Sequence, residues 1–223
     1  MTLPDSNPDY RRPRLLDLFC GAGGAAMGYH RAGFEVVGVD IRPQPNYPFE
    51  FIEADALAYL EAIHPRTGMA GAPAFDAIHA SPPCQAYSQA TAWRGSRADH
   101  PDLIAPTRQL LDATGLPYVI ENVEAARDRL HDPTMICGDD VGLAIHRRRY
   151  FETNWPLALF ALAQRHERVL QFDHGATSTE STYRDAMGCG WMTVAESRQA
   201  IPPAYTELIG HQLLAHVKAA AWA

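Results

Sequence analysis

Residues 14–24 read RLLDLFCGAGG, an apolar run that ends in a glycine-rich turn. The segment 15–19 has the composition of a buried strand, and residues 25–31 read as a helix that Gly33 ends. Glycines at such a turn let the backbone approach a ligand closely, and the start of the next helix favours negative charge. The stretch therefore predicts a strand–turn–helix unit that binds a nucleotide-like ligand, although a tight turn without a ligand has the same signature. Because the spacing is neither GxGxxG nor GK[ST], phosphate binding and an NAD-dependent dehydrogenase are disfavoured.

Four further apolar segments read as strands, and their spacing predicts the fold class. They are residues 35–40, 49–52, 75–80 and 117–120, with a helical pattern at 103–113. Strands that alternate with helices predict an α/β protein with a parallel-rich sheet covered by helices on both faces. Since ligands bind beyond the carboxyl ends of such strands, we expect the polar motifs described below to meet there. Beyond residue 153 the pattern predicts a helix at 157–171, a loop at 173–182, and closing helices at 192–200 and 206–218.

The composition is that of an ordinary globular chain, with 47% hydrophobic and 20% charged residues among 223. No apolar run is long enough to cross a bilayer and residues 1–13 lack the core of a signal peptide, so we expect a cytoplasmic protein without membrane contact. The four cysteines form no CxxC pair, which argues against a zinc knuckle and a disulfide framework, and no metal is expected. The net charge of −7 is unusual for a nucleic-acid enzyme, but Arg94, Arg97 and the triplet 147–149 could form a local basic surface.

Three motifs carry reactive or binding groups. In Ser81-Pro82-Pro83-Cys84-Gln85 the prolines stiffen the turn, and Cys84 could be a thiolate nucleophile or an inert buried thiol. In YVIENV (118–123) Glu121 has apolar neighbours that could raise its pKa and make it a proton donor, although a helix-capping role is equally consistent. RRRYF (147–151) is a basic turn or an anion site.

Two acidic residues follow the second and third predicted strands. Asp40 suits the two hydroxyls of a ribose, and Asp55 suits an adenine amino group. A single acid at a strand end is often only solvated, but successive ones make binding the better interpretation.

With these motifs in view, the sequence resembles the cytosine-C5 DNA methyltransferase family. DLFCGAGG, VVGVDI, EADAL, ASPPCQAYS, VIENV and RRRYF occur in the order of that family over about residues 14–153, and TELIGHQLL (206–214) resembles its closing motif. The resemblance implies a Rossmann-like S-adenosylmethionine-dependent methyltransferase fold and methylation of cytosine C5 in DNA. It also implies four segments: a disordered lead (1–13), a catalytic and cofactor-binding domain (14–153), a reduced target-recognition segment (154–190) and C-terminal helices that pack back (191–223).

The resemblance also implies roles for individual residues. Cys84 would add to cytosine C6, Glu121 would protonate the ring at N3, and Arg149 with Arg147 would bind the O2 of a base flipped out of the duplex. The cofactor S-adenosylmethionine would be held by Phe19, Gly21, Gly23, Gly24, Asp40, Ile41, Asp55, Ala56 and Pro83. The substrate would contact Gln85, Ser88, Arg94, Arg97 and Asn122.

Two departures from the family pattern bear on the substrate. His211 stands where the closing motif normally has Asn, which puts the role of that position in doubt. The segment between Phe151 and Trp191 has only about forty residues, which is little for reading base pairs in a groove. The recognised DNA sequence should be short or loosely defined, or a separate specificity partner should recognise it. A bacterial or phage restriction-modification setting is expected. Single-stranded DNA, RNA, a free cytosine nucleotide, or a non-catalytic cofactor-binding role remain alternatives.

Overall fold

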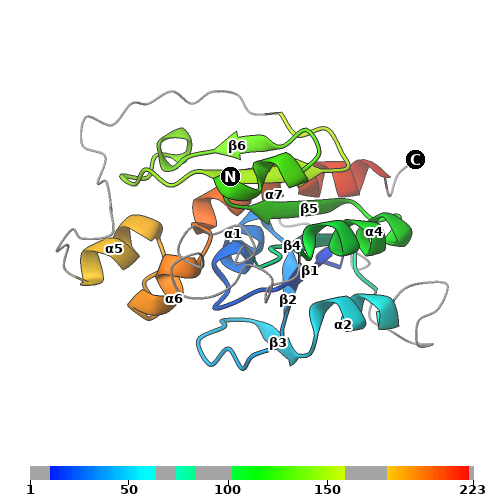
Figure 1. Cartoon of the computed structure of the whole chain (residues 1–223), viewed down its shortest axis with the longest axis horizontal. Helices are drawn as coiled ribbons and strands as arrows, with labels where there is room; N and C mark the ends of the chain where they lie inside the picture. Colours follow the sequence, from blue (N-terminus) through cyan, green and yellow to red (C-terminus); the bar gives the residue numbers. More distant parts are fainter. Residues whose placement is uncertain (1–10, 64–73, 84–101, 159–179, 221–223) are drawn as a thin grey trace.

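The computed structural model describes residues 11–63, 74–83, 102–158 and 180–220. Within these ranges seven strands form one sheet in the order β3-β2-β1-β4-β5-β7-β6 (Figure 1). Five of them pair in parallel: β1 (Arg14–Leu18), β2 (Glu35–Asp40), β3 (Glu50–Glu53), β4 (Ala77–Ala80) and β5 (Tyr118–Asn122). β7 (Arg149–Thr153) runs antiparallel to both β5 and β6 (Thr134–Ile136). Among the described strands, β7 alone therefore runs against the others.

The order of the strands places a topological switch between β1 and β4. From β1 the chain moves outward to β2 and β3, and it then returns to the other side of β1 with β4 and β5. Leu16 pairs with Val37 on one side and with Ile78 on the other, so β1 lies inside the sheet. In open sheets of this kind a ligand binds beyond the carboxyl ends of the strands at the switch.

Both faces of the sheet are covered by helices. Leu15 packs in a core cluster with residues of α1 (Gly24–Ala32) and α7 (Pro203–Ala220). The next residue, Leu16, packs in a cluster with α2 (Ala56–Ile63) and α4 (Ile104–Thr114) on the opposite face. Successive side chains of a strand point to opposite faces, so the unbroken apolar run of β1 is explained by burial on both sides. The fold is Rossmann-like, as the sequence predicts.

Several element boundaries differ from the prediction. Two short 3-10 helices, η3 (Glu124–Arg129) and η4 (Gly138–Val141), were not predicted, nor were α2 and β6. α5 (Glu180–Met187) begins inside the segment predicted as a loop, so that prediction is wrong for residues 180–182. The closing helices are α6 (Val194–Gln199) and α7, which starts at Pro203 because proline is well tolerated in the first turn. Most of the helix predicted at 157–171 lies outside the described residues.

α7 lies along α1, so the last part of the chain packs back onto the first helix of the sheet (Figure 1). None of the helices in the described ranges is long and apolar enough to cross a membrane.

The division of the chain into four segments, which the family resemblance implies, stays a prediction.

Candidate active site at the carboxyl ends of the strands

The glycine turn after β1 has one side open to a ligand. Phe19 has φ 58° and Gly21 has φ 49°, so the chain bends through the left-handed region at a residue that is not glycine. Such a conformation in a bulky residue costs free energy and persists where the surrounding contacts fix it. The Gly21 N–H donates to Oδ2 of Asp40 at 3.0 Å, which ties the turn to the end of β2. A Cβ placed on Gly21 would meet no atom within 4 Å, so a ligand could approach the backbone there.

The next two glycines face protein atoms instead. A Cβ on Gly23 would lie 2.9 Å from the side chain of Tyr47, and one on Gly24 would lie 2.3 Å from the carbonyl oxygen of Ile201. These two positions therefore need glycine for packing, and their predicted contact with a cofactor stays a prediction.

The end of β2 offers a carboxylate beside an exposed apolar side chain. Asp40 is half-buried, and its Oδ1 accepts the N–H of Arg42 at 3.0 Å while Oδ2 accepts that of Gly21. Ile41 is 65% exposed, an unusual position for a large hydrophobic residue. The end of β2 therefore has an exposed apolar side chain next to a carboxylate that is hydrogen-bonded to the glycine turn, and contact of either residue with a cofactor stays a prediction.

Asp55 and Ala56 have structural contacts at the start of α2. Oδ1 of Asp55 accepts the N–H of Ala58 at 2.9 Å, which is the hydrogen bond of a helix N-cap. Ala56 is buried in the core cluster of that face. Contact of either residue with an adenine ring stays a prediction.

The ends of β4 and β5 are joined by a buried hydrogen bond. Nδ2 of Asn122 donates to the carbonyl oxygen of Pro82 at 2.9 Å, and Pro83 that follows is exposed. This bond places the last residue of β5 next to the turn that leads into Cys84. The predicted residues that follow that turn lie outside the described residues: Cys84, Gln85, Ser88, Arg94 and Arg97.

A buried acid and a guanidinium meet at the same place. Nε of Arg149 lies 2.9 Å from Oε1 of Glu121, although that oxygen makes no hydrogen bond of good geometry, and the Glu121 side chain is only 7% exposed. Burial raises the pKa of Glu121, while Arg149, Arg147 and the Ser81 hydroxyl oppose that shift. Arg149 starts a strand rather than ending one. It reaches this position because β7 is antiparallel, so that its first residues lie beside the last residues of β5. The expectation that every motif follows a strand is therefore wrong for Arg149.

Behind Glu121 lies a buried chain of hydrogen bonds that the sequence did not reveal. The Tyr29 hydroxyl is 3.0 Å from Nδ1 of His79, and Nε2 of His79 is 2.9 Å from the Ser81 hydroxyl oxygen. Ser81 in turn is hydrogen-bonded to Glu121. When Glu121 is ionised, Ser81 donates its one proton to the carboxylate, and His79 then carries its proton on Nε2 and accepts from Tyr29 at Nδ1. Burial lowers the pKa of His79 to about 3, so the ring is neutral.

Arg147 binds the C-terminal part of the chain. Its guanidinium donates to the Tyr183 hydroxyl and to the carbonyl oxygens of Arg198 and Ala200 at 2.8–3.1 Å. Burial lowers its pKa to about 10. These contacts favour a structural role over the predicted contact with a base.

Asp17 is a buried acid that the sequence did not single out. It lies in β1 directly below the glycine turn, and neither of its oxygens makes a hydrogen bond of good geometry. Burial, and then the charge of Asp40, raise its pKa, so we expect a neutral carboxyl group.

Residues 13–135, just over half of the chain, match the family model described as C-5 cytosine-specific DNA methylase. The chain belongs to this family. The match contains the glycine turn, the end of β4 and the Glu121 strand, which are the parts of the site that the sequence motifs predict.

Two curated proteins are similar over part of the chain. M.FnuDI of Fusobacterium nucleatum, a Type II methyltransferase, is 33% identical over 89 residues, which is 37% of this chain and 24% of that protein. M.AgeI of Thalassovita gelatinovora, also a Type II methyltransferase, is 30% identical over 83 residues, which is 34% of this chain and 19% of that protein. The alignments thus span no more than about a quarter of the length of either relative.

Solved structures of methyltransferases are also similar. A prophage-encoded protein of Escherichia coli, described as a DNA modification methyltransferase, has a TM-score of 0.48 at 24% identity, with 62% of this chain and 45% of that chain covered. Spodoptera frugiperda DNMT2 has a TM-score of 0.42 at 16% identity, with 77% of this chain and 59% of that chain covered.

Proposed function

We propose that this chain transfers a methyl group from S-adenosylmethionine to C5 of cytosine in DNA, with Cys84 as the nucleophile. The observation that carries the proposal is the buried Glu121–Arg149 pair at 2.9 Å, held beside the turn into Cys84 by the Asn122–Pro82 hydrogen bond. An acid with a raised pKa and a cation, next to the segment that leads to a thiol in the sequence, supply groups that activation of a cytosine ring requires. Membership of the C-5 cytosine-specific DNA methylase family supports the same reaction.

The residues above β1 and β2 fit a cofactor of this kind. The open side of Gly21 admits a ligand to the backbone, the Asp40 carboxylate can accept hydrogen bonds from a ribose, and the exposed Ile41 can cover an apolar ring. S-adenosylmethionine would supply an electrophilic methyl group there. The strained turn at Phe19 keeps these groups in place before the ligand arrives.

The protein groups then act in sequence on the base. The Cys84 thiolate adds to C6, and the displaced electron pair is stabilised as Glu121 gives its proton to N3. Arg149 stabilises the negative charge that develops on the ring. C5 becomes nucleophilic and would take the methyl group that S-adenosylmethionine supplies, while the electron pair of the broken S–CH3 bond stays on the sulfur, which leaves as a neutral thioether. The C5 proton then leaves to a base, the N3 proton returns to Glu121, and the C6–S bond breaks to release Cys84. His79 and Ser81 hold the Glu121 carboxyl group in orientation throughout.

Duplex DNA is the substrate we favour, with the target base flipped out, because C5 of a stacked cytosine cannot be reached. The names of M.FnuDI and M.AgeI as Type II methyltransferases agree with a role in restriction-modification. The short segment 154–190 favours a short or loose target site, or recognition by a separate chain.

The test is methyl transfer to a panel of substrates. The purified chain is incubated with methyl-labelled S-adenosylmethionine and duplex DNA, single-stranded DNA, tRNA or dCMP, beside Cys84→Ser. Label at cytosine C5 of duplex DNA that is absent with the variant is the expected result. Label on another substrate alone would support the proposed methyl transfer and show that the substrate is not duplex DNA. No label on any of them, with cofactor binding intact, would overturn the catalytic proposal for this chain.

A covalent trap tests the nucleophile directly. With 5-fluorocytosine in the target, fluorine cannot leave C5 as the proton does, so the bond from Cys84 to C6 should persist after methylation. We expect a protein–DNA complex that survives denaturing electrophoresis with the wild-type chain and is missing with Cys84→Ser. A complex that forms equally with the variant would show that another residue is the nucleophile.

A further inference from the structure

The connection from β6 to β7 folds back so that its two ends meet. Cys137 follows the last residue of β6, and His146 stands three residues before β7 begins. Between them η4 is followed by Gly142, which has φ 74°, and the Leu143 N–H donates to the Gly138 carbonyl oxygen at 2.9 Å. This turn brings together two side chains nine positions apart in the sequence.

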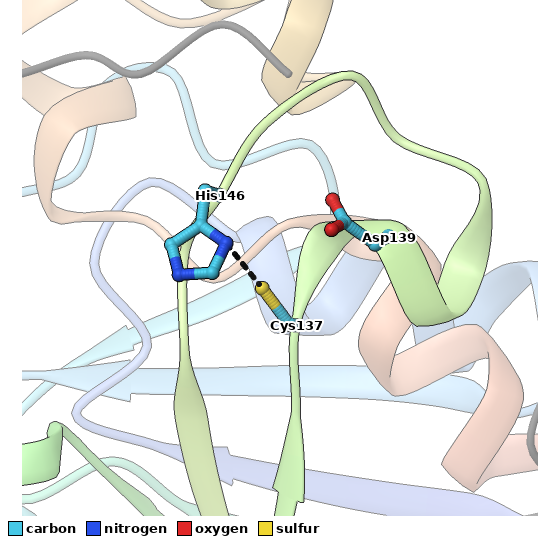
Figure 2. A group of neighbouring side chains, drawn as sticks. All are labelled: Cys137, Asp139 and His146. Carbon is cyan, nitrogen blue, oxygen red and sulfur yellow. Dashed lines mark hydrogen bonds between the residues drawn. The ribbon is translucent and has the colours of Figure 1, made fainter. Parts of the chain in front are cut away.

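Three donor atoms of different kinds meet there, as Figure 2 shows. Sγ of Cys137 lies 3.5 Å from Nδ1 of His146, and a carboxylate oxygen of Asp139 on η4 completes a group whose atoms all lie within 4.8 Å of one another. Oδ1 of Asp139 is inaccessible to solvent and has no hydrogen-bond partner among the described residues. A buried carboxylate oxygen without a donor is costly, so its position needs an explanation.

The distance between Cys137 and His146 fits a tetrahedral metal ion. With Zn–S about 2.3 Å and Zn–N about 2.0 Å, a tetrahedral ion holds the two ligand atoms about 3.5 Å apart. Thiolate, imidazole and carboxylate are together the ligands of zinc and related borderline metals, rather than of magnesium or calcium. Cys137 is buried and His146 is exposed, so a fourth position could be filled by water from the His146 side.

We propose that Cys137, Asp139 and His146 bind one divalent transition-metal ion, of which zinc is the best match. The ion would close the β6–β7 connection at both ends, with the Asp139 carboxylate as its third ligand. Arg147 follows His146 directly and Arg149 lies two residues further, so the ion would fix the segment that presents Arg149 to Glu121. The role is structural, and it holds whether or not the proposed methyl transfer is correct. The expectation of no metal rested on the missing CxxC pairs, and this site uses a different spacing.

Cobalt is a probe that reports on the ligands themselves. The full chain, stripped with a chelator, is titrated with Co²⁺, and the near-ultraviolet sulfur-to-cobalt band and visible bands are recorded. We expect one ion per chain with a tetrahedral spectrum, displaced by one equivalent of Zn²⁺. Cys137→Ser should lose the sulfur band. His146→Asn and Asp139→Asn should weaken binding at least about ten-fold, since loss of even an outer-shell partner costs that much.

Matched variants separate this site from other thiols and histidines. Cys84→Ala, Cys189→Ala and His211→Asn should leave the spectrum and stoichiometry unchanged, and circular dichroism checks that each chain is folded. Failure of the wild-type chain to bind Co²⁺ or Zn²⁺ stoichiometrically would overturn the proposal and leave a hydrogen-bonded Cys137–His146 pair. A sulfur band that survives in folded Cys137→Ser, or disappears in Cys84→Ala, would overturn it as well.

Discussion

At the scale of single residues, Glu121 is subject to two opposing effects. Its side chain is almost completely buried, which favours the neutral acid, while the Arg149 guanidinium 2.9 Å away favours the carboxylate. Burial is the larger effect, so the pKa of Glu121 is raised. A raised pKa favours the protonated acid, and an acid that gives up its proton as charge develops on a bound base is suited to protonate N3.

Replacing Glu121 tests that role. Glu121→Gln removes the proton donor and keeps the shape of the side chain, so kcat for methyl transfer should fall by about 10²–10⁴-fold. Glu124→Gln is the matched control, because Glu124 is exposed and forms a surface ion pair with Arg148 at 3.4 Å. Its rate should equal that of the wild-type chain. A Glu121→Gln enzyme with unchanged kcat would show that the acid has no part in the reaction.

His79 makes the stability of the chain depend on pH. Burial lowers the pKa of His79 from 6.5 to about 3, so the unfolded chain binds a proton more readily than the folded one. Its contribution to stability is therefore complete above about pH 6.5 and is lost as the pH falls toward 3. At pH 5 the loss should be about 2 kcal/mol, at 1.36 kcal/mol for each pH unit.

Chemical unfolding at pH 7 and pH 5 measures this effect. We expect the free energy of unfolding of His79→Gln to change with pH by about 2 kcal/mol less than that of the wild-type chain. His211→Gln, with an exposed side chain on α7, should keep the wild-type dependence. Parallel pH profiles for all three proteins would contradict a neutral, buried His79.

At the scale of elements, α1 and α7 approach so closely that two glycines are needed between them. A Cβ on Gly28 would lie 2.1 Å from the Thr206 hydroxyl oxygen and 2.2 Å from the Pro203 carbonyl oxygen. A Cβ on Gly210 would lie 2.7 Å from that of Ala32. The Thr206 hydroxyl also donates to the Ala25 carbonyl oxygen at 2.8 Å, which fixes the helices at this distance. Because α1 starts at the glycine turn, this packing also supports the proposed cofactor site.

Gly28→Ala should therefore destabilise the chain by overpacking. We expect a loss of about 1–3 kcal/mol in the free energy of unfolding, measured by urea titration. Gly190→Ala is the matched control, because a Cβ there would meet no atom within 4 Å. Its stability should lie within about 0.5 kcal/mol of wild type. Equal stability of the two variants would mean that the helices can move apart at little cost.

At the scale of the whole molecule, the charge of −7 weakens the long-range electrostatic attraction of the chain to DNA. Arg149 faces Glu121, Arg147 is bound by carbonyl oxygens, and Arg148 is 3.4 Å from Glu124. Arg94 and Arg97 are the cations that the sequence assigns to the backbone of the substrate. Two or three phosphate contacts are therefore the expectation for the isolated chain.

The salt dependence of DNA binding tests this expectation. Each neutralised phosphate contributes about −0.9 to the slope of log Kobs against log salt, so we expect a slope of about −2 to −3 on duplex DNA. Arg94→Gln and Arg97→Gln should each make the slope shallower by about one. A much steeper slope, like that of repressors with many phosphate contacts, would show that the chain has a local basic surface despite its negative net charge.

The sequence alone determined the parts of this protein that depend on local chemistry. The apolar run of β1, the glycines after it, the bounds of β2 and the polar groups after β4 and β5 follow from strand periodicity and turn preferences within a few residues. Those rules act along a short stretch of chain, so they could be applied without the fold. The family that the motifs predict is the one whose model matches residues 13–135.

Only the tertiary structure decided which of these groups meet. The reversed direction of β7 brings Arg149 to Glu121, burial joins Tyr29 to His79 across fifty positions, and a folded connection sets Cys137 against His146. Asp55 caps a helix that no pattern predicted. Each of these contacts depends on strand pairing and packing between distant segments. A local pattern contains no information on such pairing, because its free energy comes from residues far apart in the sequence.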